Sequence, residues 1–229
     1  MREGKFIVID GTDGSGKATQ AKLLVSKLRK NKFKVKTIDF PRYYKNFFGK
    51  FIGECLAGGY GDFLALNPRI ASVLYAADRF ESSKEIQKWL AEGNIVIADR
   101  YVSSNQIHQG GKIKNEKDRK DFLKWLEKME FGIFAIPKPD AVIYLDVPVE
   151  ITQKLLIGEE GGYKKRYLKG RKDAAENDIA HLQDARASAI KLIRKNNNWQ
   201  RINCVKNGEL MPIGEINDMI WNKVEKIVK

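Results

Sequence analysis

Residues 5–19, KFIVIDGTDGSGKAT, join an apolar run to a glycine-rich loop and then to an amphipathic segment. The run 6–9 predicts a buried strand, and apolar residues recur at helical spacing between positions 21 and 28. Glycines at 11 and 16 followed by Lys17 have the spacing of a P-loop, although a ligand-free glycine turn is the alternative for the loop alone. This strand, loop and helix order favours an α/β fold that binds phosphates.

The loop has the chemistry that a phosphate requires. Glycines let successive backbone N–H groups point inward at one anion, and the N-terminus of the following helix adds positive potential. Lys17 is expected to reach the outer phosphates as a point charge. The residues predicted to bind ATP are Gly11, Thr12, Asp13, Gly14, Ser15, Gly16, Lys17, Ala18 and Thr19.

Residue 18 departs from the usual P-loop signature. Alanine stands where a serine or threonine hydroxyl normally holds Mg2+, and the nearest hydroxyl belongs to Thr19. The metal must therefore be held by another residue or through water. This departure weakens an interpretation as a GTPase or a general ATPase.

Five apolar, β-branched runs alternate with helical patterns, at residues 6–10, 35–40, 95–99, 141–147 and 201–205. Such alternation predicts βαβ crossovers and a five-stranded parallel sheet with helices on both faces. A length of 229 residues suits one domain, residues 1–229. Ligands of such folds bind outside the carboxyl ends of the strands.

The formal net charge of +13 suits polyanionic partners, either nucleic acid or small phosphorylated ligands. A zinc knuckle, an aromatic RNA-binding signature and a long basic tail are absent from the sequence, so no stable nucleic-acid partner is expected. Apolar runs are too short for a signal peptide or a membrane span, and two distant cysteines suit a reducing compartment. We therefore expect a cytoplasmic protein with no membrane partner.

The second predicted strand ends in Asp39-Phe40-Pro41-Arg42. Pro41 stops the strand ladder there and leaves Arg42 at the strand mouth.

The helical pattern after it predicts an aromatic and a basic side chain on one exposed face. Ile70, Val73, Leu74 and Ala77 define the expected buried face. At 100° per residue, Tyr75 and Arg79 lie nearly opposite. A ring and a guanidinium one turn apart could stack a base and grip a phosphate, or form an ordinary surface pair.

Asp99 follows the strand at 95–99, where a carboxylate is well placed to hold Mg2+ beside P-loop phosphates. The next residues, 102–112, are dense in neutral hydrogen-bonding groups. Such groups are what the edge of a nucleobase requires.

Five motifs now stand in register: the P-loop with Asp13, FPR at 40–42, YAADRFE at 75–81, DRYVSSN at 99–105 and HQGGK at 108–112. In this order and at these separations they resemble thymidylate kinase through nearly the whole chain. Adenylate kinase, the nearest rival, places its FPR motif after a later strand and has no acid at the position of Asp13. The resemblance implies a P-loop kinase fold, ATP and Mg2+ as cofactors, small nucleotides as partners, and a homodimer.

The resemblance also assigns an acceptor site to particular residues. Asp13 is implied to contact the sugar 3′-hydroxyl, and Tyr75 to stack on thymine. His108 stands where the family often has a tyrosine or phenylalanine beneath the deoxyribose. Three arginines would arrange the acceptor phosphate, and Ser104 and Asn105 would reach the base edge. The implied dTMP-binding residues are Asp13, Phe40, Arg42, Tyr75, Arg79, Arg100, Ser104, Asn105 and His108.

Residues 158–173 combine four glycines with six basic side chains, which is typical of a mobile lid over phosphates or of a solvated basic loop. Some thymidylate kinases carry a catalytic arginine at the position of Gly14. In those with glycine the lid supplies the charge, and this chain resembles the second type. The implied catalytic residues are Lys17, Arg100, Arg166 and Arg171.

The function that the sequence predicts is ATP-dependent phosphorylation of dTMP to dTDP by in-line transfer. Three alternatives stay open. They are a kinase for another monophosphate such as dUMP or UMP, a nucleoside kinase, and a basic nucleic-acid-binding protein that uses ATP.

Overall fold

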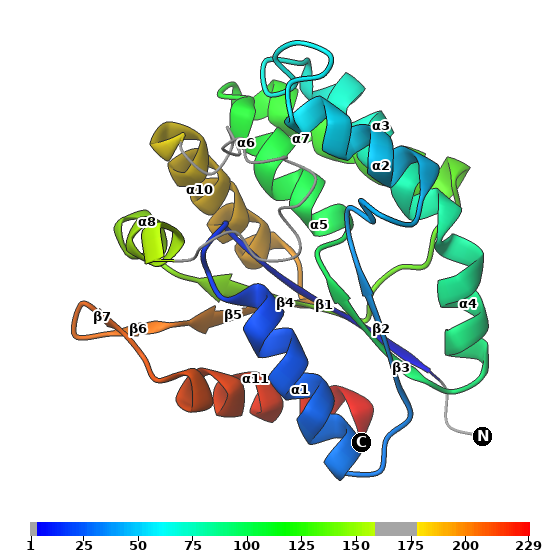
Figure 1. The fold of residues 1–229 in the computed structure, drawn as a ribbon, viewed down its shortest axis with the longest axis vertical. Helices are drawn as coiled ribbons and strands as arrows, with labels where there is room; N and C mark the ends of the chain where they lie inside the picture. The colour runs from blue at the N-terminus through cyan, green and yellow to red at the C-terminus, as the bar shows by residue number, and fades with distance from the viewer. Residues whose placement is uncertain (1–3, 159–177) are drawn as a thin grey trace.

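The computed structural model describes residues 4–158 and 178–229, which form a parallel sheet covered by helices on both faces (Figure 1). The strand order is β2-β3-β1-β4-β5, and every neighbouring pair is parallel. The strands are β1 (Lys5–Gly11), β2 (Val35–Asp39), β3 (Ile95–Asp99), β4 (Ala141–Asp146) and β5 (Trp199–Asn203). The predicted α/β fold with a five-stranded parallel sheet is confirmed.

The fifth strand lies two residues earlier than predicted. The expected run was 201–205, whereas β5 begins at Trp199, which is buried and pairs with Val142 of β4. Burial of the indole in the core sets this register, and the sequence pattern alone did not include it. A short antiparallel ribbon of β6 (Val205–Lys206) and β7 (Glu209–Leu210) follows.

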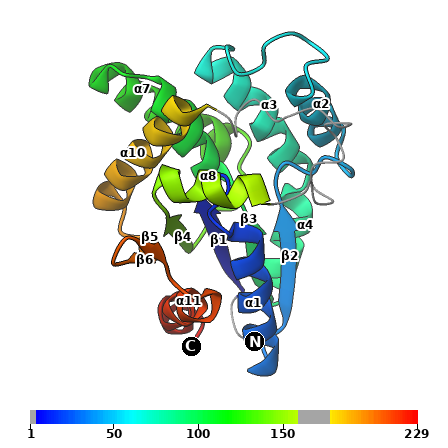
Figure 2. The same ribbon diagram turned by 60° about the vertical axis from the view of Figure 1, so that its left-hand side comes forward.

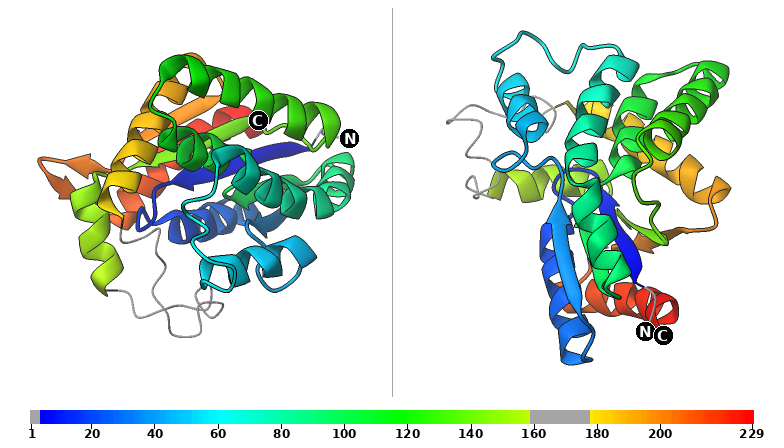
Figure 3. Two further views of the ribbon diagram at one scale, coloured as in Figure 1. Left: turned by 90° about the horizontal axis from the view of Figure 1, so that it is seen from above. Right: turned by 90° about the vertical axis from the view of Figure 1, so that its right-hand side faces the viewer.

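Two hydrophobic cores form on opposite faces of the sheet because alternate strand residues point to opposite sides. Ile7 and Ile9 pack with α1 (Lys17–Lys30) and α11 (Ile213–Val228). Phe6 and Val8 belong to the other core, together with residues of four helices. These helices are α3 (Pro68–Glu81), α4 (Ser83–Ala91), α7 (Glu116–Glu127) and α10 (Ile179–Lys195). The right-hand view of Figure 3 shows α11 below the sheet and α3, α7 and α10 above it.

The remaining helical segments gather near the carboxyl edge of the sheet. Figure 2 shows α2 (Phe47–Leu56) beside α3, with residues 57–67 joining them. A stretch from 102 to 112 is helical throughout and has a π-helical centre, a feature often found at functional sites. The other segments are α5 (Val102–Ser104), η1 (Asn105–Gln109), α6 (Gly110–Lys112), η2 (Lys128–Ile133) and α8 (Val149–Gly158).

The predicted buried face of α3 was wrong. Ile70 is 57% exposed and Val73 is 40% exposed, whereas Arg79 is only 2% exposed. The helix is rotated because its charged residues have partners inside the protein: Arg79 pairs with Glu130, and Asp78 accepts hydrogen bonds from the 42–46 loop. These interactions decide which face is buried, and the apolar stripe is left exposed.

Asp146, fully buried at the carboxyl end of β4, ties the sheet to a neighbouring helix. Arg186 of α10 donates from Nε to its Oδ1 at 2.6 Å, and Arg201 of β5 donates from Nε to its Oδ2 at 2.8 Å. The carboxylate of Asp146 therefore fixes α10 and β5 beside β4. In the sheet, β4 lies next to β1, the strand that precedes the P-loop.

Within residues 4–158 and 178–229, none of the helices combines the length and apolar character that crossing a lipid bilayer would demand.

Replacing Asp146 by asparagine should destabilise the protein by about 2 kcal/mol, because the amide cannot balance two guanidinium groups. Asp218→Asn is the matched control, since Asp218 pairs with Lys27 at 2.6 Å but its side chain is 70% exposed. That change should cost at most about 0.5 kcal/mol. Urea unfolding measures both free energies, and equal losses in the two variants would contradict the role given to Asp146.

Candidate active site

The loop after β1 has the backbone shape of a phosphate cradle. Gly14 and Gly16 have φ values of 76° and 80°, in the left-handed region that glycine adopts without strain. The N–H of Ser15 donates to the carbonyl of Thr12 at 3.2 Å, and helix α1 begins directly at Lys17. Lys17 Nζ donates to the same Thr12 carbonyl at 2.8 Å. The loop therefore encloses the lysine expected to bind the outer phosphates.

Two hydroxyl groups in this loop favour an anionic ligand. Thr12 Oγ1 and Ser15 Oγ are buried, and neither has a hydrogen-bond partner among the described residues. Buried hydroxyls are nearly always hydrogen-bonded, so these two are suited to phosphate oxygens. Ala18 and Thr19 both lie exposed at the start of α1. Neither residue adds a buried hydroxyl to the loop.

Burial lowers the pKa of Lys17 to about 8, and nearby Arg100 adds to this effect. Asp13, Asp99 and Asp10 oppose the shift, because each favours the charged amine. The lysine is therefore poised to gain positive charge when an anion binds beside it.

Arg100 joins the loop to the next strand end. Its backbone has a φ of 69°, and its N–H donates to the carbonyl of Ile9 at 3.0 Å. Its Nη2 donates to Asp13 Oδ1, and its Nη1 lies 3.3 Å from Ser104 Oγ. Burial alone would raise the pKa of Asp13, but Arg100 and Lys17 outweigh it and hold that pKa well below its usual value. Asp13 is therefore a carboxylate at all ordinary pH values.

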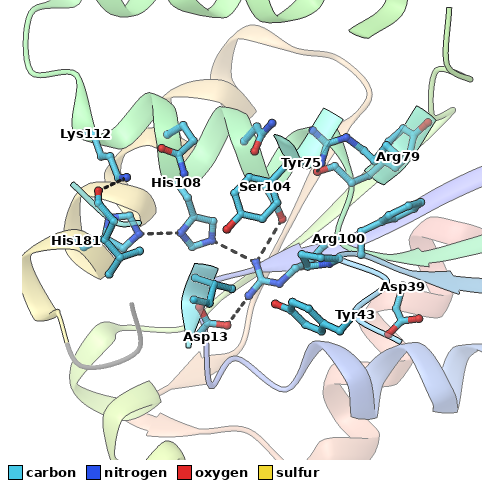
Figure 4. Close-up of a pocket in the computed structure, with 17 residues that line it drawn as sticks. Asp13, Asp39, Tyr43, Tyr75, Arg79, Arg100, Ser104, His108, Lys112 and His181 are labelled. Carbon is cyan, nitrogen blue, oxygen red and sulfur yellow. Dashed lines mark hydrogen bonds and ion pairs between the residues drawn. The ribbon is translucent and has the colours of Figure 1, made fainter. Parts of the chain in front are cut away.

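A pocket opens between Arg100 and helix α3 (Figure 4). Nearly all residues that the sequence assigned to the acceptor line it, namely Asp13, Phe40, Tyr75, Arg79, Arg100, Ser104, Asn105 and His108. The structure therefore brings together residues from five separate segments of the chain.

Arg42 is the exception. Its Nη1 donates to Ser82 Oγ at 2.9 Å and to Glu85 Oε2 at 2.8 Å, so its side chain turns toward the junction of α3 and α4. Arg42 does not line the pocket, and Tyr43 does. Tyr43 lies next to Arg100 in Figure 4. In this structure Arg42 therefore points away from the pocket, toward its partners near the junction of α3 and α4, and its expected contact with an acceptor phosphate stays a prediction.

Arg79 also differs from its expected role. Its Nε donates to Glu130 Oε2 at 2.8 Å and its Nη2 donates to Glu130 Oε1, in a fully buried, bidentate pair. Figure 4 shows Arg79 beside Tyr75, away from Asp13. Arg79 therefore belongs to the end of the pocket where Tyr75 lies, not to the end near the P-loop.

The amide of Asn105 has a defined orientation at that same end. Its Nδ2 donates to the carbonyl of Ser72 at 3.3 Å and lies 3.4 Å from Glu130 Oε1. Both partners are acceptors, which assigns the nitrogen to their side and leaves Oδ1 as the other polar atom of the amide. Asn105 and Arg79 thus share one carboxylate, that of Glu130.

Several residues in or behind the pocket wall were not predicted from the sequence. His181, in the first turn of α10, lines the pocket, and Glu130 of η2 lies buried behind it as the partner of Arg79; no motif marks either residue. Lys112 belongs to the HQGGK motif and donates from Nζ to the carbonyl of Leu64 at 2.7 Å. Tyr43 follows the FPR motif directly, so adjacency to that motif is the one signal that could have identified it.

Asp99 ends β3 and is mostly buried, and its charge acts on Lys17. A carboxylate beside the phosphate cradle fits Mg2+, which keeps waters and takes one or two protein carboxylates. The part of the chain that the structure describes contains no group of three or more His, Cys, Asp or Glu residues that could bind a metal by itself. Any Mg2+ here would therefore also need ligands from phosphate and water.

The predicted lid at 158–173, with Arg166 and Arg171, lies almost entirely outside the described residues.

Known proteins resemble this chain. The family model described as thymidylate kinase matches residues 9–211. A thymidylate kinase of Plasmodium falciparum is 33% identical over 152 residues, which cover 66% of this chain and 66% of that protein. The Mycobacterium tuberculosis enzyme is 33% identical over 147 residues, or 64% of this chain and 68% of the relative. The structure of thymidylate kinase from Candida albicans has the same fold, with a TM-score of 0.72 and 24% identity, covering 98% of this chain and 92% of that one.

Binding of ATP with Mg2+ should take up close to one proton at a pH of about 9, where most Lys17 is uncharged, because phosphate raises the pKa of the amine. Affinity should fall as the pH rises through about 8. Calorimetric titrations in buffers of different ionisation enthalpy measure the uptake. Lys17→Met is the control and should bind ATP more weakly without that proton. Equal proton uptake by the parent and the variant would contradict the assignment to Lys17.

Proposed function

The chain belongs to the thymidylate kinase family and phosphorylates dTMP, and we propose that it does so by in-line transfer from ATP in the pocket around Arg100. The observation that carries this proposal is the arrangement of the pocket. One end adjoins the P-loop and Arg100, and the other holds Tyr75, Asn105 and Arg79. A nucleoside monophosphate likewise has two unlike ends, a charged phosphate and an uncharged base.

The base end suits a pyrimidine that carries N3–H and a carbonyl at position 4. Asn105 offers Oδ1 as an acceptor for N3–H, because its Nδ2 is directed to Ser72 and Glu130. Arg79 has Nε and Nη2 on Glu130, and Nη1 donates to the carbonyl of Tyr101 at 3.4 Å, so the second N–H of Nη1 is the proposed donor for a carbonyl oxygen. Tyr75 supplies the stacking surface. Thymine and uracil present this pattern, and cytosine presents the reverse.

The phosphate end relies on Arg100. A guanidinium has five N–H donors, and those on Nη1 are directed to Ser104 and His108 while one on Nη2 meets Asp13. The edge formed by Nε and Nη2 keeps donors for a phosphate, which it can bind in bidentate fashion. Asp13 then accepts from the sugar 3′-hydroxyl in our proposal. Phe40, Ser104 and His108 complete the walls of the acceptor site.

The transfer itself needs no general base, since an acceptor phosphate is already anionic and catalysis reduces to positioning and charge compensation. Lys17 and the amides of residues 11–19 bind the ATP phosphates in this proposal. Mg2+ would be held by Asp99 together with phosphate and water, and would neutralise charge on the transferring group. Arg166 and Arg171 complete the proposed catalytic set, within a single nucleotide-kinase domain.

We also propose that the protein is a homodimer. An apolar stripe on α3, formed by Ile70, Val73 and Phe80, is exposed by 57%, 40% and 50%. Phe80 packs on Phe134 with ring centroids 5.2 Å apart, which extends the exposed surface. Contiguous apolar surface of this kind marks association, and a second copy of the chain is the proposed partner. The two unpaired, buried cysteines suit a cytoplasmic location.

A panel of acceptors with ATP tests the substrate. We expect turnover of dTMP and of dUMP, and a value of kcat/KM for dCMP lower by at least about a hundredfold, because its amino group would face Arg79 and its N3 lone pair would face Asn105. Asn105→Ala should lower kcat/KM for dTMP by about tenfold and narrow the preference over dCMP. Equal use of dCMP and dTMP would contradict the base assignment.

The same panel separates the other interpretations. A nucleoside kinase would phosphorylate thymidine, and a protein whose main role is nucleic-acid binding would show a steep salt dependence of that binding. Turnover of dTMP without nucleic acid and without turnover of thymidine would exclude both.

The basic segment has its own test. Arg166→Ala or Arg171→Ala should lower kcat on the order of a thousandfold, as loss of an arginine that compensates transition-state charge does. Arg194→Ala, at an exposed position near the end of α10, is the matched control and should keep the parent rate. Near-normal rates in both Arg166 and Arg171 variants would reject their proposed role.

A further inference from the structure

The two histidines of this chain form one hydrogen-bonded pair at the pocket wall. His108 Nδ1 lies 3.3 Å from His181 Nε2, and the ring centroids are 5.4 Å apart with an angle of 27° between the ring planes. On its other side, His108 Nε2 lies 3.2 Å from Arg100 Nη1. Figure 4 shows the resulting line of contacts, from Asp13 through Arg100 and His108 to His181.

Only one set of proton positions satisfies this line. A guanidinium can only donate, so His108 Nε2 must accept from Arg100 and its Nδ1 must carry the proton. His181 Nε2 then accepts from His108 Nδ1–H, which places the remaining proton of His181 on Nδ1. Both rings are therefore neutral and both are Nδ1–H tautomers.

We propose that His181 is a positioning residue of the phosphoryl transfer, which acts through His108 to fix the guanidinium of Arg100. The inference rests on the proposed function, in which Arg100 binds the acceptor phosphate. Nη1 of Arg100 contacts His108 and Ser104, and these two contacts orient the opposite edge of the guanidinium, formed by Nε and Nη2. Arg100 sets the tautomer of His108, and without an acceptor on its far side the ring loses the second contact that fixes its rotation.

The pair also ties Arg100 to the helix that follows the basic segment. His181 lies in the first turn of α10, and its backbone N–H donates to Asp178 Oδ1 at 2.9 Å. The backbone of His181 is thus fixed at the helix start, and its ring contacts His108 through Nε2. Helix α10 is itself fastened to β4 through Arg186 and Asp146. The sheet, the helix and the acceptor arginine therefore form one connected unit.

The surroundings keep the pair uncharged at neutral pH. Burial, followed by Arg100, lowers the pKa of His108 well below its ordinary value, while Asp13 opposes the shift and His181 and Lys17 add to it. Burial and then Lys112 lower the pKa of His181, against Asp178, Asp13 and Asp184. A proton added to either ring would put an N–H against a donor and break the line. The line is therefore intact at neutral pH and fails only in acid.

A nitrogen NMR measurement on the full chain labelled with 15N-histidine tests the proton positions without any nucleotide. Because the chain has two histidines, His181→Gln leaves one imidazole and assigns both signals. At neutral pH we expect the Nδ1–H tautomer for both rings. An Nε2–H tautomer of His108, or a charged ring, would overturn the inference even if the enzyme is active.

Kinetics test the effect on Arg100. His181→Leu removes the acceptor and should lower kcat/KM for dTMP by about fivefold, with KM for ATP unchanged. His181→Gln keeps an acceptor at the reach of Nε2 and should restore the parent value. The control Gln183→Leu, at an exposed position of α10, should be silent. Thermal unfolding confirms that each variant is folded. An equal loss toward ATP and dTMP, or an unchanged kcat/KM for dTMP in His181→Leu, would overturn the proposal.

A double-mutant cycle with His108→Leu decides whether His181 acts through His108. In the His108→Leu background, His181→Leu should add less than about a twofold further loss, since the line is already broken. If the double variant instead lost kcat/KM for dTMP by the product of the two single losses, His181 would act independently of His108 and contact the substrate itself. That result would overturn the proposal. If the parent enzyme fails to phosphorylate dTMP, the proposed function fails while the NMR result still reports on the pair.

Discussion

The ion pair between Asp13 and Arg100 joins the P-loop to the loop that follows β3. Its existence depends on strand pairing, because Ile9 of β1 and Asp99 of β3 are opposite one another at the carboxyl edge. The P-loop begins after one strand and Arg100 after the other, so both side chains start from neighbouring positions. The positive φ of Arg100 turns its side chain back toward the loop. In the proposed function, the sheet rather than a flexible connection therefore sets the distance between donor and acceptor phosphates.

The sequence was sufficient to predict the sheet and the glycine-rich loop, and most of the residues it assigned to an acceptor line one pocket. These features are encoded locally: apolar runs mark strands, glycine spacing marks the loop, and the motifs fall where strands end. Because parallel strands share one carboxyl edge, residues distant in the chain could be placed at one site without knowing any side-chain contact.

The differences at Arg79 and Arg42 share a physical cause, which is the pairing of charged and polar groups across long separations in the sequence. Arg79 was placed on an exposed face because helix periodicity treats a guanidinium as polar, whereas Glu130, 51 residues later, makes its burial favourable. Arg42 was placed at the strand mouth correctly, but Glu85 and Ser82 determine where its side chain points. His181 lacks any motif, and only the packing of α10 on η1 brings it to His108. No local pattern contains this information.

The two arginines of the pocket already have protein partners before any ligand binds, and this pairing affects selectivity. Arg79 is neutralised by Glu130, so the base end can hold an uncharged ring without leaving a buried charge unpaired. In the proposed function, the Nε and Nη2 edge of Arg100 binds the acceptor phosphate while Asp13, Ser104 and His108 engage its other donors. Substrate binding then requires little rearrangement of the pocket side chains. This favours phosphoryl transfer, because the groups that position the substrate are already in place. In the proposed function, a base with the wrong donor pattern is disfavoured, because Glu130 holds both Arg79 and Asn105 in one orientation.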